Sequence, residues 1–376
     1  MAAIHIEILG RSDIDRLSVA DSVSVRYVAA MVKYGPTTFV DNADVEINAL
    51  VVQNKVLPLV VNRGVFGNSD VCSPYSHYVG YTLQELGKRH PHLPSGLLRW
   101  CGLSFASALG AASLEKAVFV NNWLLATNPR PALSSDEIRA LTAALVARYP
   151  DSAIIFRTVN PNLDAVGFEA LRQNRYRMVR SRRVYTLDAN DKRYLEHRNA
   201  KEDLQLLRRT SYERLSNDSL AVHADRIAQL YRDLYLVKHS RLNPQFNANF
   251  VRLTLQRETL TYVALQQGGT LDAFIAYYIR EPVLTGAILG YDLKRPRKTG
   301  LYRLLIAMFI EEASKRGLIV NLSAGAGGFK MLRGALPVEE FDAVYDHHLS
   351  PQRRAVWTAL RLSAKFGAFI NRPTAA

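Results

Sequence analysis

The 376-residue sequence predicts an α/β protein built from two domains, because this length is enough for two hydrophobic cores. The order strand, helix, strand occurs over 116–159 and again over 284–323, an offset of roughly 165 residues that a duplicated architecture would produce. A polar, charged stretch without aliphatic periodicity, 191–203, predicts the domain boundary. We therefore expect an N-terminal domain over 1–190, a linker over 191–203 and a C-terminal domain over 204–376.

The N-terminal domain is predicted to begin with strands. Alternating residues indicate a strand over 3–9, and the runs 45–52 and 56–61 predict a hairpin. A strand over 116–126 is followed by a helix over 134–149 and a strand over 153–159. The helix opens with Ser134-Ser-Asp-Glu137, a capping sequence that places carboxylates at the positive end of the helix dipole and so repels phosphate. A short helix after Val159 and a strand over 176–188 close the domain.

The C-terminal domain repeats this order with a different helix start. After helices over 204–216 and 224–238, strands are predicted over 262–266, 271–279 and 284–291. In the next helix the apolar residues recur at i, i+3, i+4, i+7 and i+8, which predicts one buried face: Leu301, Leu304, Leu305, Met308 and Phe309. Gly317 ends this helix, and strands over 318–323 and 341–345 and a basic amphipathic helix over 351–370 follow.

Basic residues surround the start of the helix at 301, where free backbone N–H groups and the positive dipole end favour an anion. The residues predicted to bind phosphate are Arg295, Arg297, Lys298, Thr299, Gly300 and Leu301. Since the first helix start carries carboxylates instead, only the C-terminal domain is expected to bind the phosphates of a donor. The N-terminal domain is then a scaffold or the acceptor side.

Two segments resemble known transferases. The segment from Arg297 to Tyr302 resembles the acyl-donor loop of the Gcn5-related N-acetyltransferase (GNAT) superfamily, Gln/Arg-x-x-Gly-x-Gly/Ala, with Tyr302 at the position of the last Gly or Ala. The segment 327–334, which contains Phe329-Lys330, is similar to the Phe-Lys segment of FemAB/FemX-like transferases. This resemblance implies two GNAT-like domains in tandem, each a mixed, largely antiparallel twisted sheet flanked by helices, the first of them degenerate.

The resemblance also implies roles in acyl transfer. Lys330 matches the lysine that supports the transfer by neutralising charge at the reacting carbonyl oxygen, with Phe329 fixing its surroundings. Asp292 and His239 are candidates to remove the proton of the attacking amine, and Glu339 is a third. Tyr291 is a candidate to protonate the leaving thiolate, as are Tyr302 and Tyr345. Transfer is expected to be direct, without a covalent enzyme intermediate.

An acceptor site is predicted near the loop after the first helices of the C-terminal domain. By position, Lys238, Ser240 and Asn243 are candidates to bind the acceptor, together with Phe329. A second candidate is an aromatic stretch of the N-terminal domain with Tyr75, His77, Tyr78 and Tyr81. These rings either line an acceptor pocket or form a loop that packs on the sheet, and the sequence leaves both readings open.

The charge is unevenly divided. The net charge is +14, and residues 1–190 hold 20 Lys and Arg against 16 Asp and Glu, whereas residues 191–376 hold 28 against 18. The net charges of the halves are therefore +4 and +10, and an anionic partner such as coenzyme A, an acyl carrier protein, tRNA or a membrane suits the second half. Six arginines lie between Arg172 and Arg183; they are either a footprint for RNA or a carrier protein, or a solvated strand face.

We expect an N-acyltransferase that moves an acyl group from a phosphopantetheine thioester, acyl-CoA or acyl carrier protein, to a small-molecule or peptide amine. A FemX-like transferase that uses aminoacyl-tRNA is the first alternative, and a non-catalytic basic RNA-binding protein is the second. No tightly bound cofactor is expected, and no metal, because His347 and His348 lack a third ligand at a binding spacing. Two cysteines, Cys72 and Cys101, and no signal or membrane-spanning segment, predict a cytoplasmic protein with reduced thiols.

Overall fold

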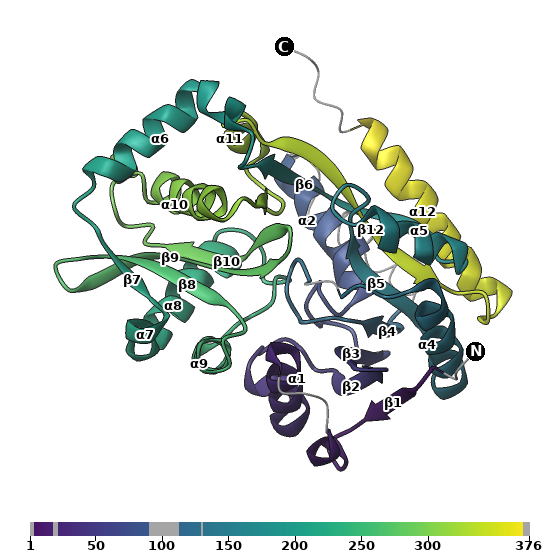
Figure 1. Ribbon diagram of the computed structural model, residues 1–376. Coiled ribbons are helices and arrows are strands. Elements are labelled where there is room, and N and C mark those ends of the chain that lie inside the picture. The colour runs from purple at the N-terminus through teal and green to yellow at the C-terminus, as the bar shows by residue number, and fades with distance from the viewer. Residues whose placement is uncertain (1–3, 18–21, 90–112, 129–130, 371–376) are drawn as a thin grey trace.

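The computed structural model describes residues 4–17, 22–89, 113–128 and 131–370. Within them, twelve strands form one continuous sheet in the order β1-β2-β3-β4-β5-β12-β6-β11-β10-β9-β8-β7, with helices on both faces (Figure 1). The strands are β1 Ile6–Leu9, β2 Glu46–Val52, β3 Lys55–Arg63, β4 Lys116–Val120, β5 Ala153–Val159, β6 Arg177–Asp188, β7 Glu213–Ser216, β8 Thr261–Gln267, β9 Thr270–Arg280, β10 Val283–Tyr291, β11 Ile319–Asn321 and β12 Leu336–Tyr345.

The helices connect these strands and cover them. The α-helices are α1 Val23–Tyr34, α2 Tyr81–Arg89, α4 Ser135–Arg148, α5 Ala165–Gln173, α6 Arg198–Arg209, α7 Asn217–Leu220, α8 Ala224–Tyr231, α9 Ala248–Gln256, α10 Leu301–Arg316, α11 Gly327–Met331 and α12 Pro351–Ile370. The 3-10 and π-helical turns used below are η3 Ser76–Gly80, η4 Lys192–Glu196, η6 Arg232–Val237 and η7 Arg297–Thr299.

The sheet is mixed and largely antiparallel, as predicted. Its parallel pairs are β4 with β5 and β10 with β11, and in each case one long helix, α4 or α10, connects the two strands. The repeated strand-helix-strand unit expected from the sequence is therefore present twice, once in each half. The helix α10 has the buried apolar face predicted for it and ends at Gly317, which has the left-handed backbone of a helix C-cap.

The two halves of the chain share strands at the centre of the sheet. β12, near the end of the chain, lies between β5 and β6 and is antiparallel to both. β6 in turn pairs with β11 over Thr186–Asp188. The sheet therefore runs without a break from one half into the other, and the last strand belongs to the same layer as β5.

The segment 191–203, predicted as a linker, is largely helical and contains η4 and the first half of α6. Its polar composition suggested exposure, but α6 buries Ala200, Asp203 and Leu207. Asp203 is buried against two arginines that lie 100 or more residues further along the chain, which the sequence of this segment does not indicate.

Three hydrophobic clusters hold the layers together. The first spans both halves: Tyr27 and Met31 of α1 belong to it together with Phe250 of α9 and Tyr262 of β8. The second lies between α6, α10 and the sheet of the C-terminal half, and the third lies between α4, α5 and the sheet of the N-terminal half. Because the first cluster is continuous across the halves, their relative position is fixed by packing as well as by strand pairing.

β10 and β11 part from each other before β10 ends. They pair only over Val283–Thr285, a β-bulge follows between Gly286 and Ile288, and β10 then continues to Tyr291 along β9 alone. Bulges re-aim a strand and are frequent beside functional sites. The opening lies at the carboxyl ends of the two parallel strands, and the segments that follow them carry the predicted site residues.

Candidate functional site

The starts of α4 and α10 differ as the sequence predicted. In α4, the Ser134 hydroxyl accepts a hydrogen bond from the Glu137 backbone at 3.1 Å, and the Glu137 carboxylate accepts one from the Ser134 backbone at 2.8 Å. α10 begins after Gly300, which has φ 70° and contributes no side chain to cap the helix. The backbone N–H groups of the first turn of α10 therefore have no side-chain cap from the adjoining residue, the arrangement that favours an anion.

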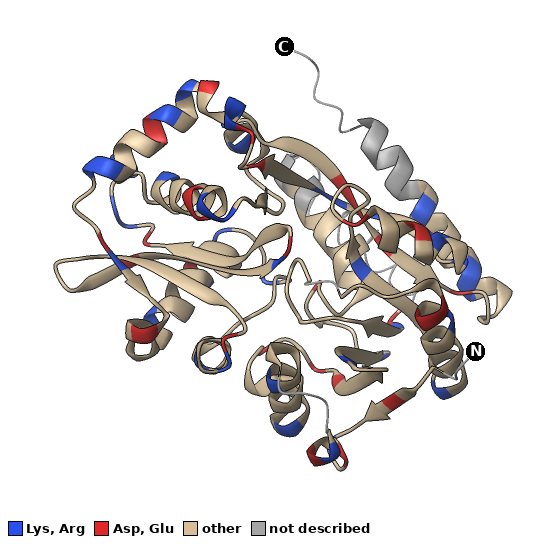
Figure 2. Ribbon diagram, in the orientation of Figure 1, with Lys and Arg blue, Asp and Glu red and all other residues tan. Residues whose placement is uncertain are grey.

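The basic residues before α10 fall into two groups. Arg295 forms an ion pair of 2.8 Å with the buried carboxylate of Asp272, so its charge is already balanced. Arg297 and Lys298 lie in η7, are exposed, and have no ion-pair partner among the residues that the structure describes. Among the predicted phosphate ligands, Arg297 and Lys298 therefore carry the positive charge that no described carboxylate balances. They directly precede Thr299, Gly300 and Leu301. Figure 2 shows how Lys and Arg are distributed over the ribbon as a whole.

Lys330 is buried on α11, with 2 % of its surface exposed. Its Nζ donates to the backbone carbonyl oxygens of Leu322, Ser323 and Ala324 at 2.7, 3.1 and 2.9 Å. Burial, with a smaller contribution from Arg182, lowers the pKa of Lys330 to about 7, while three carbonyl acceptors favour the charged ammonium. The side chain is thus a buried amine that can change its charge near neutral pH.

Aromatic rings connect Lys330 to the start of α10. The ring of Phe329 lies 4.7 Å from that of Tyr302, which lies 6.0 Å from that of Tyr291 at the end of β10. Burial, with Tyr291 nearby, raises the pKa of Tyr302 to about 12, so its phenol is a proton donor and not a phenolate at neutral pH. The structure therefore brings Phe329 together with Tyr302 in the first turn of α10 and, beyond it, Tyr291, while Lys330 is the next residue after Phe329 on α11.

A buried carboxylate fixes this arrangement. Asp203 of α6 accepts hydrogen bonds of 2.5 Å from Arg303 of α10 and from Arg333, just after α11. Arg333 also donates to the Phe329 carbonyl at 2.8 Å, and its guanidinium lies 3.3 Å from the centre of the Phe329 ring. The sequence analysis missed Asp203 and Arg333, because no local pattern distinguishes a buried pair of charges from solvated ones.

The predicted acid-base candidates lie in different environments. Asp292 accepts hydrogen bonds from Arg226 at 2.8 Å and from the Lys294 backbone. Burial alone would raise the pKa of Asp292, but these bonds hold it below the ordinary value, which makes Asp292 a weak base. His239 is exposed, with its ring 6.1 Å from that of Tyr235.

The turn after η6 uses its polar groups within the protein. The Asn243 amide donates to the carbonyls of Tyr235 and Ser240, and its oxygen accepts from Tyr81 at 2.9 Å. The Ser240 hydroxyl donates to Gln84 at 2.5 Å. These bonds tie the turn to the helix η3-α2 of the N-terminal half, whereas the neighbouring Lys238 is exposed.

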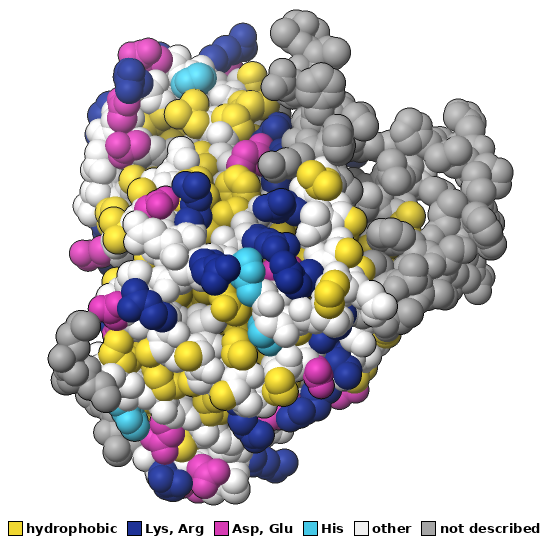
Figure 3. Space-filling model, turned by 90° about the vertical axis from the view of Figure 1, so that its right-hand side faces the viewer, with side chains coloured by type: hydrophobic (Ala, Val, Ile, Leu, Met, Phe, Trp, Pro, Cys, Tyr) yellow, Lys and Arg dark blue, Asp and Glu magenta, His cyan; other side chains and the backbone are white. Residues whose placement is uncertain are grey.

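The arginines between 172 and 183 are mostly paired with carboxylates. Their ion pairs are Arg172–Glu169, Arg177–Asp346, Arg180–Glu339, Arg182–Glu340 and Arg183–Glu339. Glu339, one of the proton-acceptor candidates, is therefore paired with two arginines. Burial alone would raise the pKa of Glu339, but Arg180 and Arg183 hold it below the ordinary value. Figure 3 shows Lys and Arg side chains gathered near the centre of the face that carries α12, with hydrophobic side chains around them.

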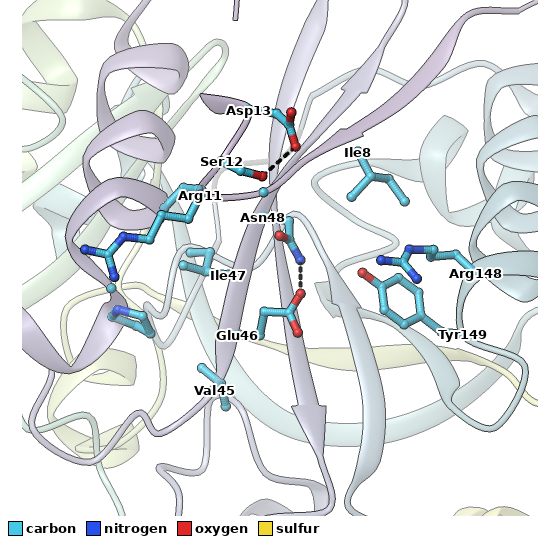
Figure 4. Close-up of a pocket in the computed structure, with 14 residues that line it drawn as sticks. Ile8, Arg11, Ser12, Asp13, Val45, Glu46, Ile47, Asn48, Arg148 and Tyr149 are labelled. Atoms are coloured by element: carbon cyan, nitrogen blue, oxygen red, sulfur yellow. Dashed lines mark hydrogen bonds between the residues drawn. The ribbon is translucent and has the colours of Figure 1, made fainter. Parts of the chain in front are cut away.

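A separate cavity of about 480 Å³ lies in the N-terminal half, beside β1 and β2. Asn48, Glu46 and Tyr149 line it, with Arg148 and Arg11 at its sides (Figure 4). Glu46 is already bonded to Asn48 and Arg63. None of the residues predicted to act in transfer lines this cavity.

Other predictions concern cysteine, metal and membrane. Cys72 is buried and burial raises the pKa of its thiol, as expected of an unreactive thiol; Cys101 lies outside the described residues. In the described ranges, no cluster of three or more His, Cys, Asp or Glu side chains is arranged to hold a metal ion. No helix in the same part of the chain combines the length and apolar character needed to cross a membrane.

Known proteins resemble this chain in structure only. No protein-family model matches the sequence, and no curated protein matches it significantly. Among solved structures, FemX aligns over 94 % of this chain and 100 % of its own, with 6 % identity and a TM-score of 0.49. A tandem GNAT protein from the clavulanic acid biosynthesis pathway aligns over 91 % and 98 %, with 10 % identity and a TM-score of 0.37. L-PGS from Bacillus licheniformis aligns over 60 % and 78 %, with 13 % identity and a TM-score of 0.43.

Proposed function

We propose that this protein is an N-acyltransferase that moves an acyl group from a phosphopantetheine thioester to an amine in the cytoplasm. The observation that carries the proposal is the position of buried Lys330 on α11, whose neighbour Phe329 contacts Tyr302 in the uncapped first turn of α10. The first turn of α10 suits the phosphates of a donor. Lys330 on α11 is a cation that can act on the carbonyl group of the same donor. In the sequence, α10 follows β10 and α11 follows β11, the two parallel strands that part from each other.

The chemistry requires one exchange of hydrogen bonds. All three N–H groups of the Lys330 ammonium are donated to backbone carbonyls, so one of these bonds is given up for the acyl carbonyl oxygen. The neutral amine nitrogen then forms the C–N bond as the C–S bond breaks. Tyr291, whose ring lies 6.0 Å from that of Tyr302, protonates the departing thiolate and takes up the proton that the new amide nitrogen loses.

Calorimetry with coenzyme A and acetyl-CoA tests the donor site. We expect saturable binding, weakened about tenfold or more by Arg297→Glu combined with Lys298→Glu, since each removes a positive charge from the helix start. The matched control is Arg16→Glu combined with Lys33→Glu, the same change at exposed residues of the N-terminal half. No binding of coenzyme A, acetyl-CoA or an acylated carrier protein, or equal weakening in the control, would contradict the proposal.

A transferase that uses aminoacyl-tRNA is the second candidate. The observation that favours it is the excess of positive charge in the C-terminal half of the chain, which suits the phosphates of tRNA. Pairing of five arginines between 172 and 183 with carboxylates leaves fewer free cations for phosphates than the sequence indicated. Loss of the activity after ribonuclease treatment would favour this candidate. A protein that only binds RNA would show steeply salt-dependent affinity that Lys330→Ala does not change.

A further inference from the structure

The aromatic stretch of the N-terminal half lies where the two halves meet. The Tyr78 hydroxyl donates to the Asp342 carboxylate on β12 at 2.7 Å. Nε2 of His77 lies 2.8 Å from the Ser181 hydroxyl on β6 and 3.7 Å from the same carboxylate. Partners on two central strands therefore fix the His77 ring, and Nε2 is the nitrogen that they engage.

The other ring nitrogen of His77 faces a carboxylate across a gap. Nδ1 lies 3.9 Å from Oδ2 of Asp70, which is too long for a hydrogen bond. The only other side-chain contact recorded for Asp70 among the described residues is a long one, 3.3 Å, from the Ser69 hydroxyl. The side chains of His77 and Asp70 are 12 % and 15 % exposed, so both are largely enclosed and each keeps a small exposed surface.

Acidic and basic side chains lie close together around this gap. The carboxylates of Asp342 and Glu340 are buried and that of Asp70 is partly exposed, and the guanidinium groups of Arg182 and Arg157 lie near them. Arg182 is bonded to Glu340 at 2.8 Å and to Thr127 at 2.5 Å, and it also interacts electrostatically with Asp70 and Asp342.

A second polar atom in the same group is unsatisfied. Oε1 of Glu340, which is 1 % exposed, has no hydrogen-bond partner among the residues that the structure describes. A buried carboxylate oxygen without a partner is unfavourable unless a cation or a hydrogen-bond donor compensates it. The junction therefore favours a ligand that carries positive charge and N–H groups.

We propose that the gap between His77 and Asp70 binds a primary amine. A nitrogen placed about 2.9 Å from both Nδ1 and Oδ2 fits across a separation of 3.9 Å, and a primary ammonium has N–H groups for both. A quaternary ammonium has no N–H group, and an alcohol lacks the charge. This inference rests on the proposed function: if the protein is an N-acyltransferase, the amine bound at this site is the acyl acceptor.

Binding is tested without any acyl donor, so the result is independent of the donor site. The probe is n-butylamine near neutral pH, where it is an ammonium ion, and the readout is the NMR signal of the His77 ring, assigned as the signal absent from His77→Gln. We expect a saturable shift with n-butylamine, and no saturable shift with butyltrimethylammonium or n-butanol.

Asp70→Asn should weaken n-butylamine binding about tenfold or more, because it removes the charge opposite the amine. The control Asp15→Asn changes a carboxylate that is 88 % exposed and should leave the affinity unchanged. Calorimetry of n-butylamine binding to His77→Gln should show the same loss of affinity. This second variant tests the site even if Asp70→Asn does not fold. Equal shifts with the quaternary ion, or full affinity in either site variant, would overturn the proposal. Failure of coenzyme A to bind would leave it standing as an amine site without the proposed donor.

Discussion

The rings of Tyr302 and Phe329 lie with their centres 4.7 Å apart, which joins the first turn of α10 to the helix that carries Lys330. Tyr302 occupies the position where the GNAT pattern has Gly or Ala, and its ring points toward α11 instead of leaving the helix start bare. The departure from the pattern therefore coincides with a contact between the two predicted parts of the site.

Replacement of Lys330 should separate catalysis from folding. Lys330→Met keeps the length of the side chain and removes its charge, so we expect thioester consumption in the presence of an amine to fall about 10²–10³-fold. Release of free thiol measures the rate, and circular dichroism checks the fold. An unchanged rate in a folded variant would remove Lys330 from the mechanism.

The stability of the protein should depend on pH through Lys330. Burial lowers its folded-state pKa from 10.5 to about 7, so between these values the unfolded chain holds a proton that the folded chain does not. The free energy of unfolding should therefore rise with pH from about 7 to 10.5 relative to Lys330→Met, and the destabilising effect of the buried ammonium should be complete below pH 7. Urea unfolding at several pH values measures this difference. Parallel curves for the two proteins would show that the carbonyl acceptors keep Lys330 charged throughout.

We expect the carboxylate of Asp203 to contribute to the stability of the protein, and the carboxylate of the neighbouring Glu202 to contribute little. Asp203→Asn leaves Arg333 buried without its carboxylate partner, so we expect a loss of about 3–5 kcal/mol in the free energy of unfolding. Glu202→Gln on the same helix breaks an exposed pair with Arg198 and should change little. Chemical denaturation of both variants decides the point, and equal losses would refute the role given to Asp203.

Gly300 should resist substitution for two reasons that can be separated. Its φ of 70° is strained for any other residue, at about 1–2 kcal/mol, and an added Cβ would lie 2.8 Å from Cδ2 of Leu206. Gly269 has φ 76° but no atom within 4 Å of such a Cβ, so Gly269→Ala carries the backbone strain alone. Thermal unfolding should show a larger loss for Gly300→Ala, and calorimetry should show weaker coenzyme A binding in that variant only.

Periodicity and capping were sufficient to predict the repeated unit. The heptad-like spacing of Leu301, Leu304 and Met308 gave the extent of α10, and Ser134 with Glu137 gave the start of α4, because both are local patterns. The mixed sheet followed from the resemblance to GNAT proteins.

Long-range pairing was not predictable from the sequence. The polar segment around Asp203 suggested a linker because burial of a charge depends on partners such as Arg303 and Arg333, distant in the chain. The contacts of His77 were not predictable either, because its partners Ser181 and Asp342 lie on the distant strands β6 and β12. The arginines between 172 and 183 suggested either a footprint for RNA or a carrier protein or a solvated strand face, because the sequence does not show that carboxylates such as Glu339 and Glu340 lie beside them.

The insertion of β12 between β5 and β6 has a consequence for biosynthesis. As the chain leaves the ribosome, β5 and β6 are complete long before residue 345, and the edges they will give to β12 stay vacant until then. Expression of the first 190 residues alone would leave those edges permanently open, so we expect that fragment to aggregate. The N-terminal half thus depends on a strand from near residue 345 to complete its part of the sheet.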